Sequence, residues 1–205
     1  MGALDTLSVF SIYAQSSSTS TEASRILIQF PTDQITADRD ANKIGASGTV
    51  SFYMRMFNAP HNETLPSDFT LIVQPISQSW QEGTGKSSNY LDRTRNGIGS
   101  NWIMASSGTL WSQQGGTYFS SSYSQSFSQG SEDLLVDLSP LVENWIKGST
   151  PNNGVGVFLT HSQEVSGTQS YYTKKFFGRG SEFFFKRPIL EARWDSTSSD
   201  ERSKF

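Results

Sequence analysis

Short stretches in which apolar and polar residues alternate recur along most of the chain. In residues 49–57, Val50, Phe52, Met54 and Met56 occupy every second position, a period that predicts a strand with one buried face. Comparable signals mark residues 7–13, 25–30, 69–76, 134–138, 155–159, 183–186 and 189–194. Short strands separated by turn residues predict an all-β fold, an antiparallel β-sandwich of the jelly-roll kind.

One segment departs from the strand period. Ser139 and Pro140 supply a cap oxygen and a first-turn proline, and Gly148 suits the residue that ends a helix. Glu143 is expected near the positive end of the helix dipole. Four residues between these signals share one face: Leu141, Val142, Trp145 and Ile146. The sequence therefore predicts one short helix at about residues 139–147, packed on the core through Trp145.

Strand signals are weak between residues 80 and 131, which are rich in Gly, Ser, Asn and Gln. We expect long loops there, lying over one end of the sandwich, and loops of this length usually bind a ligand or pack against a partner. Residues 1–195 are expected to form a single jelly-roll domain, followed by a polar tail at residues 196–205. The abrupt end at Lys204 and Phe205 leaves open a continuation in a longer protein.

Composition narrows the classes of function. The 35 serines equal the 16 basic and 19 acidic residues combined, so the expected surface carries hydroxyl groups more than charges. A net charge of −3 argues against general nucleic-acid binding, and no apolar run reaches membrane-spanning length. Basic residues near the C-terminus are expected on a solvated strand face or a subunit contact: Lys174, Lys175, Arg179, Lys186, Arg187 and Arg193.

The sequence contains no motif that predicts catalysis. It lacks a Gly-x-Ser-x-Gly elbow, a phosphate loop and a dinucleotide fingerprint, and His61 and His161 are too few for a histidine-based metal cluster. Candidates for a glycosidase carboxylate pair match by residue type alone: Glu82, Asp92, Glu132 and Glu182. We expect no enzyme activity and no cofactor. Asp92, Asn96 and the carbonyls of residues 89–99 could hold a structural calcium ion, without a supporting motif.

Several elements, taken in order, resemble DNRLRE-type domains, which are jelly-roll sandwiches related to carbohydrate-binding modules. Residues 24–30 (SRILIQF) are similar to the family's "SR-x-L-I-x-F" strand, and residues 80–83 match its "W-x-E-G" element. Residues 137–154 resemble its helix segment, and residues 187–190 its closing "RP-x-L". The resemblance covers residues 4–195 and implies a jelly roll. An edge strand with which the family usually opens is either missing or lies outside the given sequence, and the late Ser-x-Glu element is only approximate.

Residues 174–195 (KKFFGRGSEFFFKRPILEARWD) are also similar to the C-terminal part of DNRLRE-like domains in virion structural proteins of tailed bacteriophages. This resemblance implies a non-enzymatic structural component of a phage virion, as a head decoration, neck or fibre module. Its expected partners are other virion proteins and further copies of itself, with no nucleic acid and no membrane.

Two sets of aromatic residues are candidate contacts. Under the virion hypothesis, a dense phenylalanine run buries against a neighbouring subunit: Phe176, Phe177, Phe183, Phe184 and Phe185. The alternative is a carbohydrate-binding module that stacks loop tryptophans on a surface glycan: Trp80, Trp102 and Trp111. The same tryptophans would serve equally to attach the loops to the core.

Overall fold

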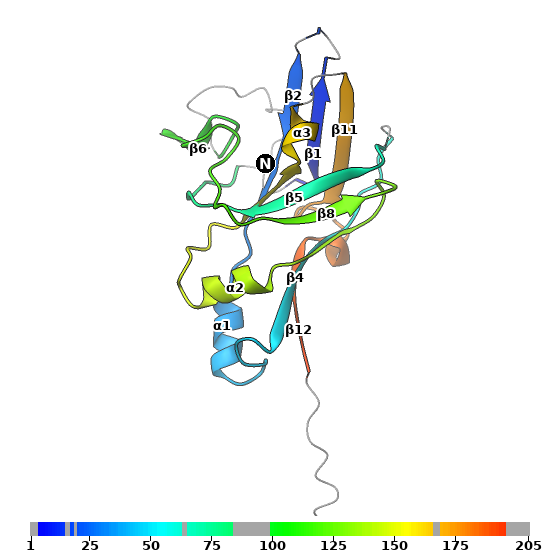
Figure 1. Ribbon diagram of the computed structural model, residues 1–205. Helices are drawn as coiled ribbons and strands as arrows, with labels where there is room; N and C mark the ends of the chain where they lie inside the picture. Colours follow the sequence, from blue (N-terminus) through cyan, green and yellow to red (C-terminus); the bar gives the residue numbers. More distant parts are fainter. Residues whose placement is uncertain are drawn as a thin grey trace, which may run out of the picture.

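The computed structural model describes residues 4–14, 17–18, 20–62, 65–83, 99–165 and 169–195. This part of the chain is mostly antiparallel β-sheet, with three α-helices (Figure 1). None of the described helices is long and apolar enough to cross a membrane. The expected β-sandwich architecture is therefore supported, and the prediction of a calcium site at Asp92 and Asn96 lies outside the described residues.

One sheet holds four strands, each antiparallel to its neighbour. In spatial order they are β3 (Ile26–Ile28), β10 (Val155–Leu159), β5 (Phe69–Pro75) and β8 (Tyr123–Phe127). Burial alternates strictly along β5, with Phe69, Leu71 and Val73 facing the core. The period of two seen in the sequence thus corresponds to one buried face.

The opposite layer consists of two groups of three strands. The first is β11 (Ser170–Phe177), β1 (Thr6–Tyr13) and β2 (Thr21–Ser24), and the second is β12 (Ile189–Trp194), β4 (Val50–Met56) and β9 (Leu134–Asp137). The chain after β4 joins them, because the Phe177 N–H donates to the Phe57 carbonyl and the Ala59 N–H to the Lys175 carbonyl. β11 and β12 therefore follow one another along β4.

The core lies between the two layers and draws on strands from both. Phe52, Met54 and Met56 of β4 are fully buried there, as are Leu71 and Val73 of β5. Each large apolar side chain removed from water in this way contributes about 1.5–3 kcal/mol to folding. The alternation predicted for residues 49–57 and 69–76 is confirmed.

The predicted helix at residues 139–147 is α2 (Ser139–Ile146), and Trp145 is buried against the core as expected. Its start differs from the expectation, because Leu138 occupies the N-cap position. The Ser139 N–H instead donates to Asp137 Oδ1, and the Ser139 hydroxyl oxygen accepts the Phe52 N–H of β4. Ser139 thus attaches the helix to the sheet rather than capping it.

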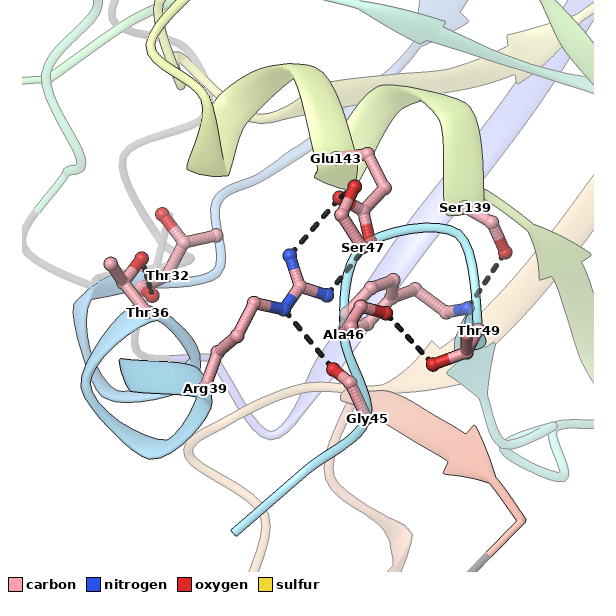
Figure 2. A network of polar contacts seen from close by, with 10 residues as sticks. Thr32, Thr36, Arg39, Gly45, Ala46, Ser47, Thr49, Ser139 and Glu143 are labelled. Carbon is pink, nitrogen blue, oxygen red and sulfur yellow. Dashed lines mark hydrogen bonds and ion pairs between the residues drawn. The ribbon is translucent and has the colours of Figure 1, made fainter. Parts of the chain in front are cut away.

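The expectation of a single helix is wrong, since α1 (Asp33–Asp40) and α3 (His161–Glu164) are also present. α1 lies beside α2 and has no buried residue of its own. Arg39 of α1 donates to both carboxylate oxygens of Glu143 in α2, at 3.0 and 2.7 Å (Figure 2). This largely buried ion pair, which an apolar periodicity does not reveal, holds α1 in place together with the partly buried Ile35.

Two expectations about strands are corrected. Residues 80–131 were expected to be loops, but they include the small sheet of β6 (Met104–Ser106) and β7 (Thr109–Leu110), as well as β8. Residues 183–186 were expected to be a strand, whereas Phe184–Lys186 is a turn of 3-10 helix, η2. β2 and β11 carry too many polar residues on both faces to give a clear alternation.

Candidate functional site: an exposed phenylalanine turn

Residues 178–188 leave the sheet between β11 and β12, and we call residues 181–187 the phenylalanine turn. Its entry is fixed against the start of the chain, because the Gly178 N–H donates to the Asp5 carbonyl at 2.7 Å and the Gly180 N–H to that of Leu4. A Cβ atom at Gly178 would collide with the Leu4 carbonyl oxygen, so only glycine permits this approach. The backbone of Leu4 and Asp5, just before β1, thereby sets where the turn projects.

Polar contacts stabilise the turn internally. Arg187 donates through Nε and Nη2 to the Ser181 carbonyl at 3.0 and 2.9 Å, and the Phe183 N–H donates to the Ser181 hydroxyl. The Lys186 ammonium lies 5.1 Å from the Phe177 ring and 5.6 Å from the Phe183 ring. These cation–π contacts keep positive charge beside the aromatic rings.

The turn presents three phenylalanines to solvent. Phe183 is 53% exposed, Phe184 65% and Phe185 88%, and the last two rings meet edge to face at 5.5 Å. Phe176 and Phe177, expected to belong to the same contact surface, are instead 0% and 8% exposed. Phe176 belongs to the main core, whereas Phe177 points to the other face of β11, where its ring lies 5.5 Å from that of Phe183. Only the second half of the phenylalanine run is accessible.

Two of the three candidate tryptophans attach loops to the body of the protein. Trp111 is 6% exposed and its indole N–H donates to the Asn101 carbonyl at 2.9 Å. The Trp80 indole N–H donates to the Asn153 carbonyl at 2.7 Å, and its side chain packs against the small buried cluster that contains Trp111. Trp102 differs, since it remains 38% exposed. The loop-attachment alternative therefore describes Trp80 and Trp111.

Trp102 belongs to a cluster around Arg25 that the sequence did not reveal. The Arg25 guanidinium lies 5.0 Å from the Trp102 ring and 4.7 Å from the Phe158 ring. Its Nε donates to Glu164 at 2.7 Å. Burial works against the charge on Arg25, but the bonds to Glu164 outweigh it and raise the pKa of the guanidinium. Arg25 thus forms a rigid support behind one face of Trp102.

Lys174 is not on a solvated face, in contrast to the expectation for the C-terminal basic residues. It is 1% exposed, and its ammonium donates to Asn58 Oδ1 and to the carbonyls of Gly130 and Glu132 at 2.7, 2.8 and 2.6 Å. Burial lowers the pKa of Lys174 to about 8. The residue closes one end of the core by joining β11 to the turn before β9.

Of the four carboxylate candidates, Glu82, Glu132 and Glu182 lie among the described residues and Asp92 lies outside them. The described residues contain no group of three or more His, Cys, Asp or Glu side chains positioned to hold a metal ion. Glu82 pairs with Arg179 at 2.9 Å, and the Glu132 carboxylate accepts bonds from the turn at residues 128–129. These two carboxylates have structural partners.

Comparison of the chain with models of known protein families, with curated proteins and with solved structures gives no match. Membership of the DNRLRE-type domains and a phage origin therefore stay predictions from the sequence.

Proposed function

We propose that this chain is a non-enzymatic structural module of a tailed-phage virion, folded as a jelly roll, which acts through protein–protein contacts. The observation that carries the proposal is the phenylalanine turn, where Phe183, Phe184 and Phe185 are all more than half exposed. The resemblance of residues 174–195 to virion proteins includes this same segment. Further copies of the chain or neighbouring virion proteins are the expected partners.

The energetics of the turn favour burial in an interface. Covering a phenylalanine side chain removes about 150–250 Å² from water, which is worth about 1.5–3 kcal/mol. The turn is also already ordered by Arg187 and Lys186, so association would immobilise few side chains. Interface centres are enriched in aromatic residues and arginine, as in the phenylalanines and Arg187 of this turn.

The test is the self-association of a double variant, Phe184→Ser with Phe185→Ser, followed by sedimentation velocity. We expect the variant to keep the wild-type unfolding temperature while its association weakens by roughly tenfold or more. Val165→Ser is the matched control, because Val165 is a 61% exposed apolar residue outside the turn. Equal association of the double variant and the wild type would contradict a role for the turn.

A second candidate, a carbohydrate-binding module, is favoured by one observation at Trp102. Its ring is the exposed one of the three loop tryptophans, and Arg25 holds it from behind. A fixed, partly exposed indole can stack on the apolar face of a sugar ring. Titration of the chain with a glycan panel should then shift Trp102 fluorescence, and Trp102→Ala should abolish the shift. No change with any glycan would remove this candidate.

A further inference from the structure

β12 is an edge strand. Its sheet has the order β12-β4-β9, so β4 covers one side of β12, and within the described ranges no strand pairs with the other side (Figure 1). A free edge presents unpaired N–H and C=O groups that can accept another strand. What can pair there depends on which backbone groups of β12 point away from β4 and on which side chains accompany them.

The hydrogen bonds of Phe52 show which backbone groups of β12 point away from β4. Its N–H donates to Ser139 Oγ and its carbonyl accepts the Leu138 N–H, both at 2.8 Å and both on the β9 side of β4. Phe52 lies opposite Ala192, so these two form a pair without mutual hydrogen bonds. Because such pairs alternate with bonded ones in antiparallel sheets, the N–H and C=O groups of Leu190, Ala192 and Trp194 point to the free edge.

The side chains of β12 indicate which strand fits this edge. We propose that β12 pairs antiparallel with β12 of a second copy of this chain, centred on Ala192; this inference rests on the proposed assembly role. In that register, the residues whose backbone groups point to the free edge lie opposite one another. Ala192 meets its own equivalent, and Leu190 lies opposite the partner's Trp194. Every backbone group on the free edge from Leu190 to Trp194 then has a partner.

Charge selects this register over its neighbours. Centred on Ala192, the pairing places Glu191 opposite the partner's Arg193, and it does so twice by symmetry. The adjacent registers that keep the backbone bonds are centred on Glu191 or on Arg193, and each places like charges directly opposite one another. Opposite charges in facing positions stabilise a strand pair, and like charges destabilise it. Among these three registers, the edge is complementary to itself only in the one centred on Ala192.

The two faces of the paired strands support the same arrangement. Glu191 and Arg193 lie on the outer face, where Glu191 already contacts Arg55 at 2.7 Å and Arg193 at 2.6 Å. Leu190 and Ala192 lie on the inner face against the core. Trp194, 37% exposed in the single chain, would gain an apolar neighbour across the dyad. The sheets and cores of the two copies would become continuous.

The absence of cysteine from the sequence allows a direct test of register. Glu191→Cys and Arg193→Cys are made as separate full-length chains, mixed and mildly oxidised. Facing residues of a pair without mutual hydrogen bonds lie about 4.5 Å apart between Cα atoms, which suits a disulfide. The mixed pair also keeps one Glu191–Arg193 contact. We expect the mixture to give a covalent dimer and each chain alone to give little.

Three results would overturn the register. They are cross-linking by Glu191→Cys alone, cross-linking by Arg193→Cys alone, or none in the mixture. Ala192→Pro provides an independent test, since it removes an N–H that points away from β4 and so leaves the fold intact. Losing that bond from both copies should weaken the dimer roughly 10- to 100-fold, whereas the control Ala192→Val should not.

The outcomes separate this inference from the proposed function. A wild-type chain that associates, loses association with Phe184→Ser and Phe185→Ser, and gives no cross-link in the mixture would overturn the β12 pairing alone. A cross-linking mixture in which the phenylalanine substitutions have no effect would support the pairing and contradict the role of the turn. A wild-type chain that stays monomeric at every concentration would overturn both.

Discussion

At the scale of single residues, the buried Lys174 connects several segments of the chain through its hydrogen bonds. Lys174 comes from a core-facing position of β11, and its ammonium meets three oxygen acceptors while lying 5.1 Å from the rings of Phe127 and Phe176. Lysine is rarely buried without a full set of partners. The three acceptors are therefore as dependent on Lys174 as the lysine is on them.

Replacing Lys174 tests this dependence. Lys174→Met keeps the length of the side chain but leaves the carbonyls of Gly130 and Glu132 without their donor. Since an unsatisfied buried polar group costs about 1–3 kcal/mol, we expect the free energy of unfolding to fall by about 2–4 kcal/mol, measured by urea denaturation. Lys175→Met, on the outer face of the same strand, should cost much less. Equal losses for the two variants would show that the buried hydrogen bonds of Lys174 add no stability beyond that of Lys175.

The Glu132 carboxylate predicts a dependence of stability on pH. Burial alone would raise its pKa, but bonds from the backbone of Gln129 and from Ser128 outweigh burial and lower the pKa to about 2. A glutamate in the unfolded chain has a pKa of about 4.3. The folded pKa is the lower one, so the stabilisation is fully present above the unfolded value and is lost as pH falls towards 2.

The corresponding measurement compares the wild type with Glu132→Gln by urea unfolding across pH. The variant should be less stable at pH 7, and the difference between the two proteins should narrow as pH falls from about 4.5 to about 2. A difference that stays constant over this interval would show that the charge of Glu132 does not contribute to the free energy of unfolding.

At the scale of secondary-structure elements, polar contacts attach α1 to α2, a role that apolar side chains more commonly have. Arg39 and Glu143 join α1 to α2 with side chains that are 14% and 11% exposed. The Ser47 hydroxyl donates to the same carboxylate, and Arg39 Nε donates to the Gly45 carbonyl (Figure 2). Burial opposes the charge of Glu143, but the Arg39 bond outweighs it and lowers the pKa of the carboxyl group.

Breaking this pair should detach α1. Arg39→Met leaves Glu143 buried without its countercharge, and removing one partner of a buried pair typically costs about 3–5 kcal/mol. We expect a loss of about 2–4 kcal/mol in the free energy of unfolding, because the pair is not fully buried. Glu143→Gln in the same chain should recover part of it. A fully additive double variant would show that the two residues do not act together.

The elements that the sequence predicted share a physical reason, as do those it missed. β4, β5 and α2 each bury one apolar face, so periodicity revealed them. α1 has no buried residue, and β11 mixes Lys174 with Phe176 on its core face, so neither shows the expected period. At the candidate site, the phenylalanine run was visible, but its division between core and solvent depends on where β11 ends and η2 begins.

At the scale of the whole molecule, the phenylalanine turn and the edge strand β12 follow one another directly along the chain. Phe183, Phe184 and Phe185 project between β11 and β12, and β12 itself ends the sheet. Both features belong to residues 178–194, so the two proposed contacts lie in one continuous segment. The rest of the described surface is mainly polar, in keeping with its hydroxyl-rich composition.

The most direct test of the proposed assembly role is native mass spectrometry of the full-length chain over a concentration series, from low to high micromolar. The account predicts a discrete oligomer whose stoichiometry does not drift with concentration. The same series on the Phe184→Ser and Phe185→Ser double variant should shift the population towards monomer. A wild-type chain that remains monomeric across the whole series would contradict the account.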